Sequence, residues 1–200
     1  EIDLGLKAYM NKVYSFMAFG LALTGALAHL TASLAFDFST NTMTSFGAAI
    51  YASPLAFIIM LSPLAFIIAL NFGVAKMKES TVQILFWAFA AVMGLSLSSI
   101  FIQFTGASVA RVFFITAGAF GALSLYGYTT KKDLSGWGSF LFIGLIGILL
   151  ASIVNIFLQS TGIQFAISVI GVLVFAGLTA YDTQKIKAMY YDGYGQEGKK

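Results

Sequence analysis

Six long apolar runs dominate this sequence of 200 residues and restrict what it can fold into. Each run has close to the ~20 residues that a helix needs to cross the hydrocarbon core of a bilayer. The runs lack the polar–apolar alternation of membrane barrel strands. Because backbone groups in lipid must be hydrogen-bonded internally, we predict helices. The expected spans are approximately residues 13–35, 46–70, 83–103, 110–128, 137–158 and 164–184.

The composition supports a membrane location. Hydrophobic residues make up 59% of the chain and charged residues 10%, whereas soluble domains average about 25% charged residues. A chain of this length cannot bury so much apolar surface in a water-soluble globule. We therefore expect an all-α, polytopic membrane helix bundle that forms a single domain over residues 1–200, with 185–200 as a cytoplasmic-side polar tail. This composition argues against a soluble enzyme and a nucleic-acid-binding module.

The basic residues predict the orientation in the membrane. Ten of the eleven fall on one side if the six spans are correct, and only Arg111 falls on the other. The ten precede the first span or follow the second, fourth and sixth spans: Lys7, Lys12, Lys76, Lys78, Lys131, Lys132, Lys185, Lys187, Lys199 and Lys200. Positive charge is enriched on the cytoplasmic side of membrane proteins, so we expect a cytoplasmic N-terminus.

The second expected span contains a tandem repeat. Residues 53–61 read SPLAFIIML, and residues 62–70 read SPLAFIIAL. Each copy holds one of the two prolines, Pro54 and Pro63, which should free a backbone carbonyl and kink the helix. One interpretation is a locally duplicated apolar segment. The other is a broken helix that lines a pore or acts as a hinge.

Small residues recur at helical spacing in the first and third spans. Gly20, Thr24 and Ala28 share one face of the first span, and Gly94 and Ser98 share one face of the third. Small residues at this spacing let helix backbones approach closely. We expect packing surfaces there rather than a ligand site.

Three polar residues inside the spans have a simple structural interpretation. His29, Asn155 and Gln159 are each costly in lipid unless they find a partner, so we expect interhelical hydrogen bonds. Asn155 is also a candidate pore-lining residue. The chain has one histidine and no cysteine, which leaves little for a metal site or a nucleophilic dyad.

Asp182 is the only acidic residue within the six expected spans. A carboxylate costs about 2.5–3.5 kcal/mol at the centre of a bilayer and less near its rim. One interpretation is an interfacial residue that pairs with Lys185, three positions further along. A helix C-terminus is, however, unfavourable for an anion. The other interpretation is a proton- or cation-sensing gate in which this carboxylate contacts a cation transiently.

Three motifs resemble the Bax inhibitor family of membrane proteins, most closely its bacterial branch. They are Tyr181–Gln184 at the end of the sixth span, Met93–Ser99 in the third span, and Tyr126–Ser135 from the end of the fourth span onward. Their order along the chain matches the family, and the resemblance covers essentially everything from Lys12 onward.

The resemblance implies a fold and an activity. The family fold is a seven-helix bundle in which six helices surround the last one. Its members are associated with a pH-sensitive calcium leak, gated by a hydrogen-bonded pair of aspartates on helices six and seven. A bacterial member modulates a membrane-bound AAA protease. By its motif, Asp182 corresponds to the aspartate of helix six.

Other family features have no match in this sequence. The seventh helix and the second aspartate are missing, and Asp192 lies in a segment whose composition predicts a loop, residues 188–196. For a basic residue that pairs with the acidic pair, Lys76 and Lys78 are the nearest candidates. We expect the chain to be a piece of a longer protein, with a six-helix variant as the alternative.

The expected function is therefore a pH-sensitive calcium leak channel gated by Asp182, in a bacterial inner membrane. A mitochondrial inner membrane is the alternative location. The chain is not expected to be an enzyme or to need a cofactor. Its expected partners are the lipid bilayer and the calcium ion. The main alternative is a non-transporting protein that modulates a membrane AAA protease or joins a larger membrane complex; a proton-coupled transporter is a further one.

Overall fold

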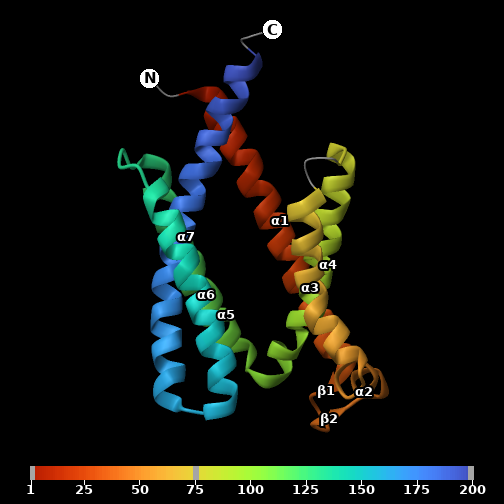
Figure 1. Cartoon of the computed structure of the whole chain (residues 1–200). Coiled ribbons are helices and arrows are strands. Elements are labelled where there is room, and N and C mark those ends of the chain that lie inside the picture. Colours follow the sequence, from red (N-terminus) through yellow and green to blue (C-terminus); the bar gives the residue numbers. More distant parts are fainter. Residues whose placement is uncertain (1–2, 74–76, 198–200) are drawn as a thin grey trace. The chain divides into compact units, whose positions relative to one another are not determined.

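The computed structural model describes residues 3–73 and 77–197, which are almost entirely helical (Figure 1). The helices are α1 Leu4–Ala35, α2 Ser45–Tyr51, α3 Leu55–Gly73, α4 Glu79–Gln103, α5 Gly106–Thr129, α6 Ser135–Leu158 and α7 Thr161–Glu197. A two-stranded hairpin, β1 Phe36–Asp37 with β2 Thr42–Met43, joins α1 to α2. Within the described residues, six helices are long and apolar enough to cross a membrane: α1, α3, α4, α5, α6 and α7. The prediction of an all-α, polytopic membrane bundle is confirmed.

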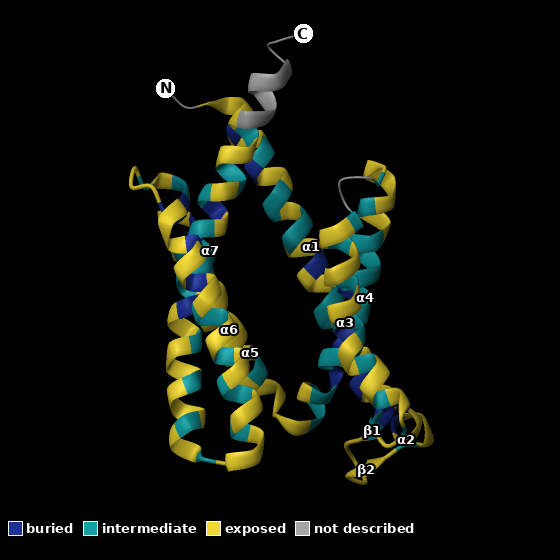
Figure 2. Ribbon diagram, in the orientation of Figure 1, coloured by how far each residue is buried: buried dark blue, intermediate teal, exposed yellow. Residues whose placement is uncertain are grey.

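Large apolar side chains lie on the surface of these helices. Exposed residues run along most of their length (Figure 2). Phe72 and Phe157, for example, are each 83% exposed. Such surfaces are unfavourable in water and suit contact with lipid chains.

The chain divides into two compact units, and each is described here by itself. The N-terminal unit comprises residues 11–111, and the C-terminal unit comprises residues 112–200 together with 1–10.

In the N-terminal unit, α1 and α4 pack closely and run in the same direction. The hydroxyl of Thr24 donates a hydrogen bond to the carbonyl of Ala90 (2.8 Å). A Cβ added to Gly94 would lie 2.6 Å from the carbonyl oxygen of Thr24, and one added to Gly20 would lie 2.7 Å from the ring of Phe86. The predicted packing role of the small residues is thus confirmed for this helix pair. Because α1 and α4 are parallel, the segment between them must return across the membrane.

That returning segment, expected as one span over 46–70, is two helices. Pro54 lies in the break between α2 and α3, while Pro63 lies buried inside α3. Because Pro63 has no N–H, it cannot donate a hydrogen bond to the carbonyl of Ile59. The hydroxyl of Ser62 donates a hydrogen bond to that carbonyl instead (2.8 Å). The helix is therefore broken at the start of the first copy of the repeat, whereas it continues through the second copy.

The hairpin between α1 and α2 is organised by Asp37. Its carboxylate accepts hydrogen bonds from the hydroxyl of Ser39 (2.6 Å) and from the backbone N–H groups of Ser39 and Thr40. These bonds favour the charged form and lower the pKa of Asp37 to about 2. Asp37 therefore has a structural role in the turn of the hairpin.

In the C-terminal unit, α6 and α7 form an antiparallel pair. A Cβ on Gly138 would contact the ring of Tyr181, and one on Gly177 would lie 2.9 Å from the side chain of Leu141. Helix α5 approaches α7 at Gly127, where a Cβ would meet the carbonyl of Ala180.

Two side chains of α7 fix the segment that connects α5 to α6. The Gln184 amide accepts a hydrogen bond from the N–H of Leu134 (2.8 Å) and donates one to the carbonyl of Lys132 (2.8 Å). The ammonium group of Lys187 donates to the carbonyl of Tyr128 (2.8 Å). Lys132 and Leu134 lie between the helices and Tyr128 lies in the last turn of α5, so these backbone groups have no partner within a helix.

Two boundaries differ from the prediction. Helix α1 begins at Leu4 rather than near residue 13, and α7 continues to Glu197 through the tail and loop expected after residue 185. Residues 185–190 favour helix formation, and the Tyr190 ring packs 5.5 Å from the Tyr9 ring, so the helix does not end with the apolar run. Three lysines of the predicted basic set lie outside the described residues: Lys76, Lys199 and Lys200.

The close approach of α1 and α4 gives a stability prediction. Gly94→Ala should lower the free energy of unfolding by about 1–3 kcal/mol, because the new methyl group would press on backbone atoms that cannot move aside. Unfolding in detergent micelles measures the change. Gly25→Ala, on α1, is the matched control, since nothing lies within 4 Å of its Cβ position. Equal stability of both variants would contradict the packing described.

The Gln184 bonds give a second stability prediction. Gln184→Met keeps the size of the side chain and removes both bonds to the connecting segment, which should cost about 1–3 kcal/mol of unfolding free energy. The same unfolding measurement applies. Gln164→Met on the same helix is the control, because the Gln164 side chain is exposed and makes no hydrogen bond within the described residues. A loss no greater than that of the control would refute the role of Gln184.

Candidate functional site

Asp182 lies near the C-terminal end of the span Thr161–Tyr191 of α7, three positions before Lys185. Its side chain is exposed on the helix surface, and among the described residues no hydrogen bond or ion pair reaches its carboxylate. The ammonium group of Lys185 lies 6.0 Å from the centre of the Tyr181 ring. Lys185 interacts with Asp182 electrostatically, without a direct hydrogen bond or a close ion pair.

The other three residues of the Tyr181–Gln184 motif face the protein. Tyr181 packs against Gly138 of α6, and Gln184 holds the segment before that helix. Thr183 is buried, and its hydroxyl donates to the carbonyl of Thr179 (2.9 Å). The motif thus fixes this end of α7 on three sides and presents Asp182 on the remaining one.

A single carboxylate in this position can exchange a proton or attract a cation. In dedicated sites calcium is bound by roughly six to eight oxygen ligands. A single aspartate is therefore suited to a transient contact with calcium and not to tight binding. In the part of the chain that the structure describes, no group of three or more His, Cys, Asp or Glu residues could hold a metal ion.

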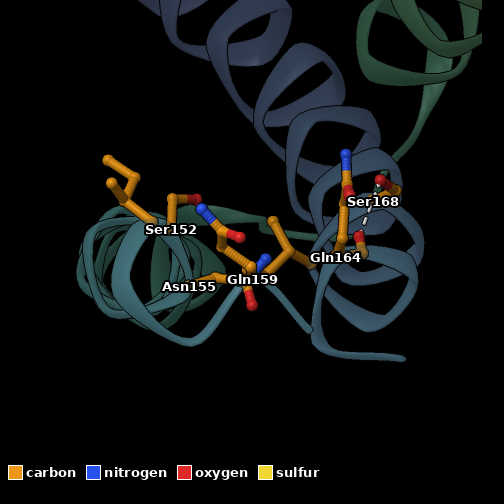
Figure 3. A pocket seen from close by; sticks show the side chains of 7 residues that line it. Ser152, Asn155, Gln159, Gln164 and Ser168 are labelled. Atoms are coloured by element: carbon orange, nitrogen blue, oxygen red, sulfur yellow. Dashed lines mark hydrogen bonds between the residues drawn. The ribbon is translucent and has the colours of Figure 1, made fainter. Parts of the chain in front are cut away.

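Asn155 lines a cavity of about 500 Å³ at the turn between α6 and α7 (Figure 3). Figure 3 shows its side chain gathered there with four other polar ones: Ser152, Gln159, Gln164 and Ser168. The side-chain amide oxygen of Asn155 (Oδ1) accepts a hydrogen bond from the N–H of Ser160 (3.1 Å). Asn155 thus forms a local hydrogen bond at the end of α6 in place of the expected interhelical one. Gln159, the residue that follows α6, has a left-handed backbone conformation (φ 49°).

The two prolines lie apart from these polar groups in the sequence and differ in setting. Pro54 follows α2, and the last residue of α2, Tyr51, forms a hydrogen bond with Ser98 of α4 (2.5 Å). Ser98 is fully buried, so this bond ties α2 to α4 beside the break. The sequence placed Ser98 on a packing face but gave no sign of its bond to Tyr51, which comes from 47 residues away.

His29 does not form the expected interhelical hydrogen bond. Its ring lies edge-on to the ring of Phe101 on α4, with the ring centres 5.7 Å apart. This contact is a packing interaction between α1 and α4.

Comparison with known proteins identifies the family. The family model "Inhibitor of apoptosis-promoting Bax1" matches residues 6–198. The inner membrane protein YbhL of Escherichia coli K12 is 47% identical over 188 residues, which is 92% of this chain and 76% of that protein. A Rickettsia prowazekii protein, RP147, is 47% identical over 94% of this chain and 76% of its own length. A Streptococcus pyogenes membrane protein is 32% identical over 99% of this chain and 83% of its own.

No solved structure matches the chain. The family match nevertheless extends over almost the whole sequence and includes every helix that can cross a membrane. The chain therefore belongs to the Bax inhibitor family of integral membrane proteins.

Proposed function

We propose that the full-length protein is a pH-sensitive calcium leak of the bacterial inner membrane, with Asp182 as the gating carboxylate. The observation that supports this role is the setting of Asp182: a carboxylate in a membrane span, without a hydrogen bond or ion pair among the described residues. Its neighbours in the motif are held by α6 and the segment before it. The proposed role is not enzymatic.

The proposed mechanism uses the charge of one side chain. A protonated Asp182 is neutral, and a neutral carboxyl is tolerated where the dielectric is low. Ionisation adds a charge that needs water or a cation beside it. The family resemblance implies a second aspartate nearby; two such groups would share a proton when closed and repel each other when it leaves. Rising pH would thus open the path, and an ionised carboxylate would attract calcium.

The break at Pro54 is the proposed moving element. A gate needs a part that has two arrangements. The chain between α2 and α3 is not helical at Pro54, whereas α3 runs unbroken through Pro63, so bending would concentrate at the first proline. The Tyr51–Ser98 bond would hold one of the two arrangements.

A second candidate function is a non-transporting partner protein. The observation that favours it is the length of α7, which continues to Glu197, past the apolar run that ends near residue 184. Such a helical extension could engage a membrane protease or a larger complex. Asp182 would then have only a structural role.

Calcium flux into liposomes that contain the full-length protein separates the two functions. We expect flux to rise as the pH goes from about 6 to about 8, because ionisation opens the proposed gate. Asp182→Asn should abolish this pH dependence and hold the flux near its low-pH value, since Asn cannot ionise. Glu79→Gln, which also removes a carboxylate but at the exposed start of α4, should behave like the wild type.

Two results would decide against the leak. Folded protein that gives no more flux than empty liposomes would leave the partner function as the better account. Flux that keeps its pH dependence in the Asp182→Asn variant would retain the leak but remove Asp182 as its gate.

The proposed orientation, with a cytoplasmic N-terminus, has its own test. The chain has no cysteine, so single cysteines can be introduced without removing native ones. Ser39→Cys, in the hairpin before α2, should react with a membrane-impermeant maleimide from outside intact cells. Thr130→Cys, between α5 and α6, should react only after the membrane is opened. The reverse labelling pattern would overturn the orientation.

A further inference from the structure

A groove in the C-terminal unit takes no part in the proposed leak. It lies where the ends of α5, α6 and α7 meet and has a volume of about 360 Å³. We call it the interfacial groove. We call the lining residues that lie further along the helices from the α5–α6 connection the floor: Leu123, Ala176 and Gly177. We call the lining residues in or beside that connection the mouth: Lys132, Tyr126 and Trp137.

The floor of the interfacial groove suits an acyl chain. Leu123 belongs to α5, and Ala176 and Gly177 to α7, and both helices are apolar enough to span the membrane. Ala176 has a small side chain and Gly177 has none, and the side chain of Leu141 on α6 packs at the Gly177 position. An apolar channel that opens within the span is more favourably filled by a hydrocarbon chain than by water.

The mouth of the groove has the residues of a membrane–water interface. Trp137 is 61% exposed and Tyr126 is 48% exposed. Such aromatic side chains favour the depth of the lipid headgroups and glycerol. They therefore place the mouth at the surface of the bilayer while the floor lies within it.

The charge at the mouth is positive and available. Among the described residues, the ammonium group of Lys132 has no ion pair, while its backbone carbonyl is fixed by the amide of Gln184. Lys131 adds a second exposed positive charge beside it. A phosphate at this position would meet a lysine whose backbone is already ordered.

Asp133 also lines the groove, but its carboxylate is engaged elsewhere. It accepts a hydrogen bond from the N–H of Ser135 (2.8 Å), at the start of α6. Hydrogen bonds to Ser135 lower the pKa of Asp133. Asp133 therefore stays ionised, and two lysines with one aspartate (Lys131, Lys132 and Asp133) leave a formal net charge of +1 at the mouth.

We propose that the interfacial groove binds an anionic phospholipid. The phosphate lies at Lys132, the glycerol region lies against Trp137 and Tyr126, and one acyl chain fills the floor between α5 and α7. A free phosphate would leave the apolar floor empty, and a zwitterionic lipid would gain less from the lysine. The proposal does not depend on calcium transport.

Tryptophan fluorescence tests the proposal directly. The 200 residues contain two tryptophans, Trp87 and Trp137. Trp87→Phe, together with replacement of any tryptophan outside these residues, leaves Trp137 as the single reporter. The full-length protein is placed in phosphatidylcholine bilayers that contain a small fraction of either brominated phosphatidylglycerol or brominated phosphatidylcholine. Bromine quenches a tryptophan that it approaches.

We expect brominated phosphatidylglycerol to quench Trp137 as strongly as brominated phosphatidylcholine does when it is present at about one-fifth of the lipid fraction. This preference is the one expected from one lysine near an anionic headgroup. Lys132→Gln should remove this fivefold preference, and Lys132→Arg should retain it. Lys78→Gln, an exposed lysine in the N-terminal unit, is the matched control and should leave the preference unchanged.

Several results would overturn the proposal. Equal quenching by the two lipids would show that the groove does not select an anionic headgroup. A preference that survives Lys132→Gln would place the anionic lipid elsewhere. Loss of the preference on adding inorganic phosphate at constant ionic strength would indicate a small-anion site. No quenching by either lipid would mean that protein covers Trp137. Circular dichroism checks that each variant is folded. The comparison of the two lipids with the wild-type lysine at position 132 tests the preference even if a Lys132 variant does not fold.

Discussion

The absence of water in the hydrocarbon core is the constraint on which this structure depends. Each polar backbone group there must find a partner within the protein. Helices satisfy most of these groups, and side chains satisfy the rest. The hydroxyl of Ser62 bonds the carbonyl that Pro63 leaves free, the hydroxyl of Thr24 joins α1 to a carbonyl of α4, and the Gln184 amide bonds two backbone groups between α5 and α6.

Asp182 stands out against this background. Its neighbours Tyr181, Thr183 and Gln184 are packed, buried or hydrogen-bonded, while its own carboxylate has no hydrogen bond or ion pair in the described part of the chain. Of the residues that the structure describes, only Lys185, three positions further along the helix, acts electrostatically on this carboxylate. Charged residues within a span are costly, and they mark ion and proton paths in membrane proteins. The contrast within one short motif is the reason for assigning its fixed residues to structure and Asp182 to function.

The sequence predicted the features that depend on composition and regular spacing. Six spans, the packing of Gly94 against α1 and the break at Pro54 follow from apolar length, small side chains and the missing proline N–H. It did not predict the Tyr51–Ser98 bond, which depends on how distant segments meet. The sequence also did not predict the full length of α7. Glycine-rich residues are poor at starting a helix, but a helix that has already formed can continue through them.

The central claim is that Asp182 changes its protonation when the path opens. Infrared difference spectroscopy on the full-length protein in bilayers measures this directly through the absorption of the protonated carboxyl group. The account predicts that this band weakens over the same pH range in which calcium flux rises, and that Asp182→Asn lacks the change. A carboxyl signal that stays constant through that range, or that changes equally in the variant, would contradict the account.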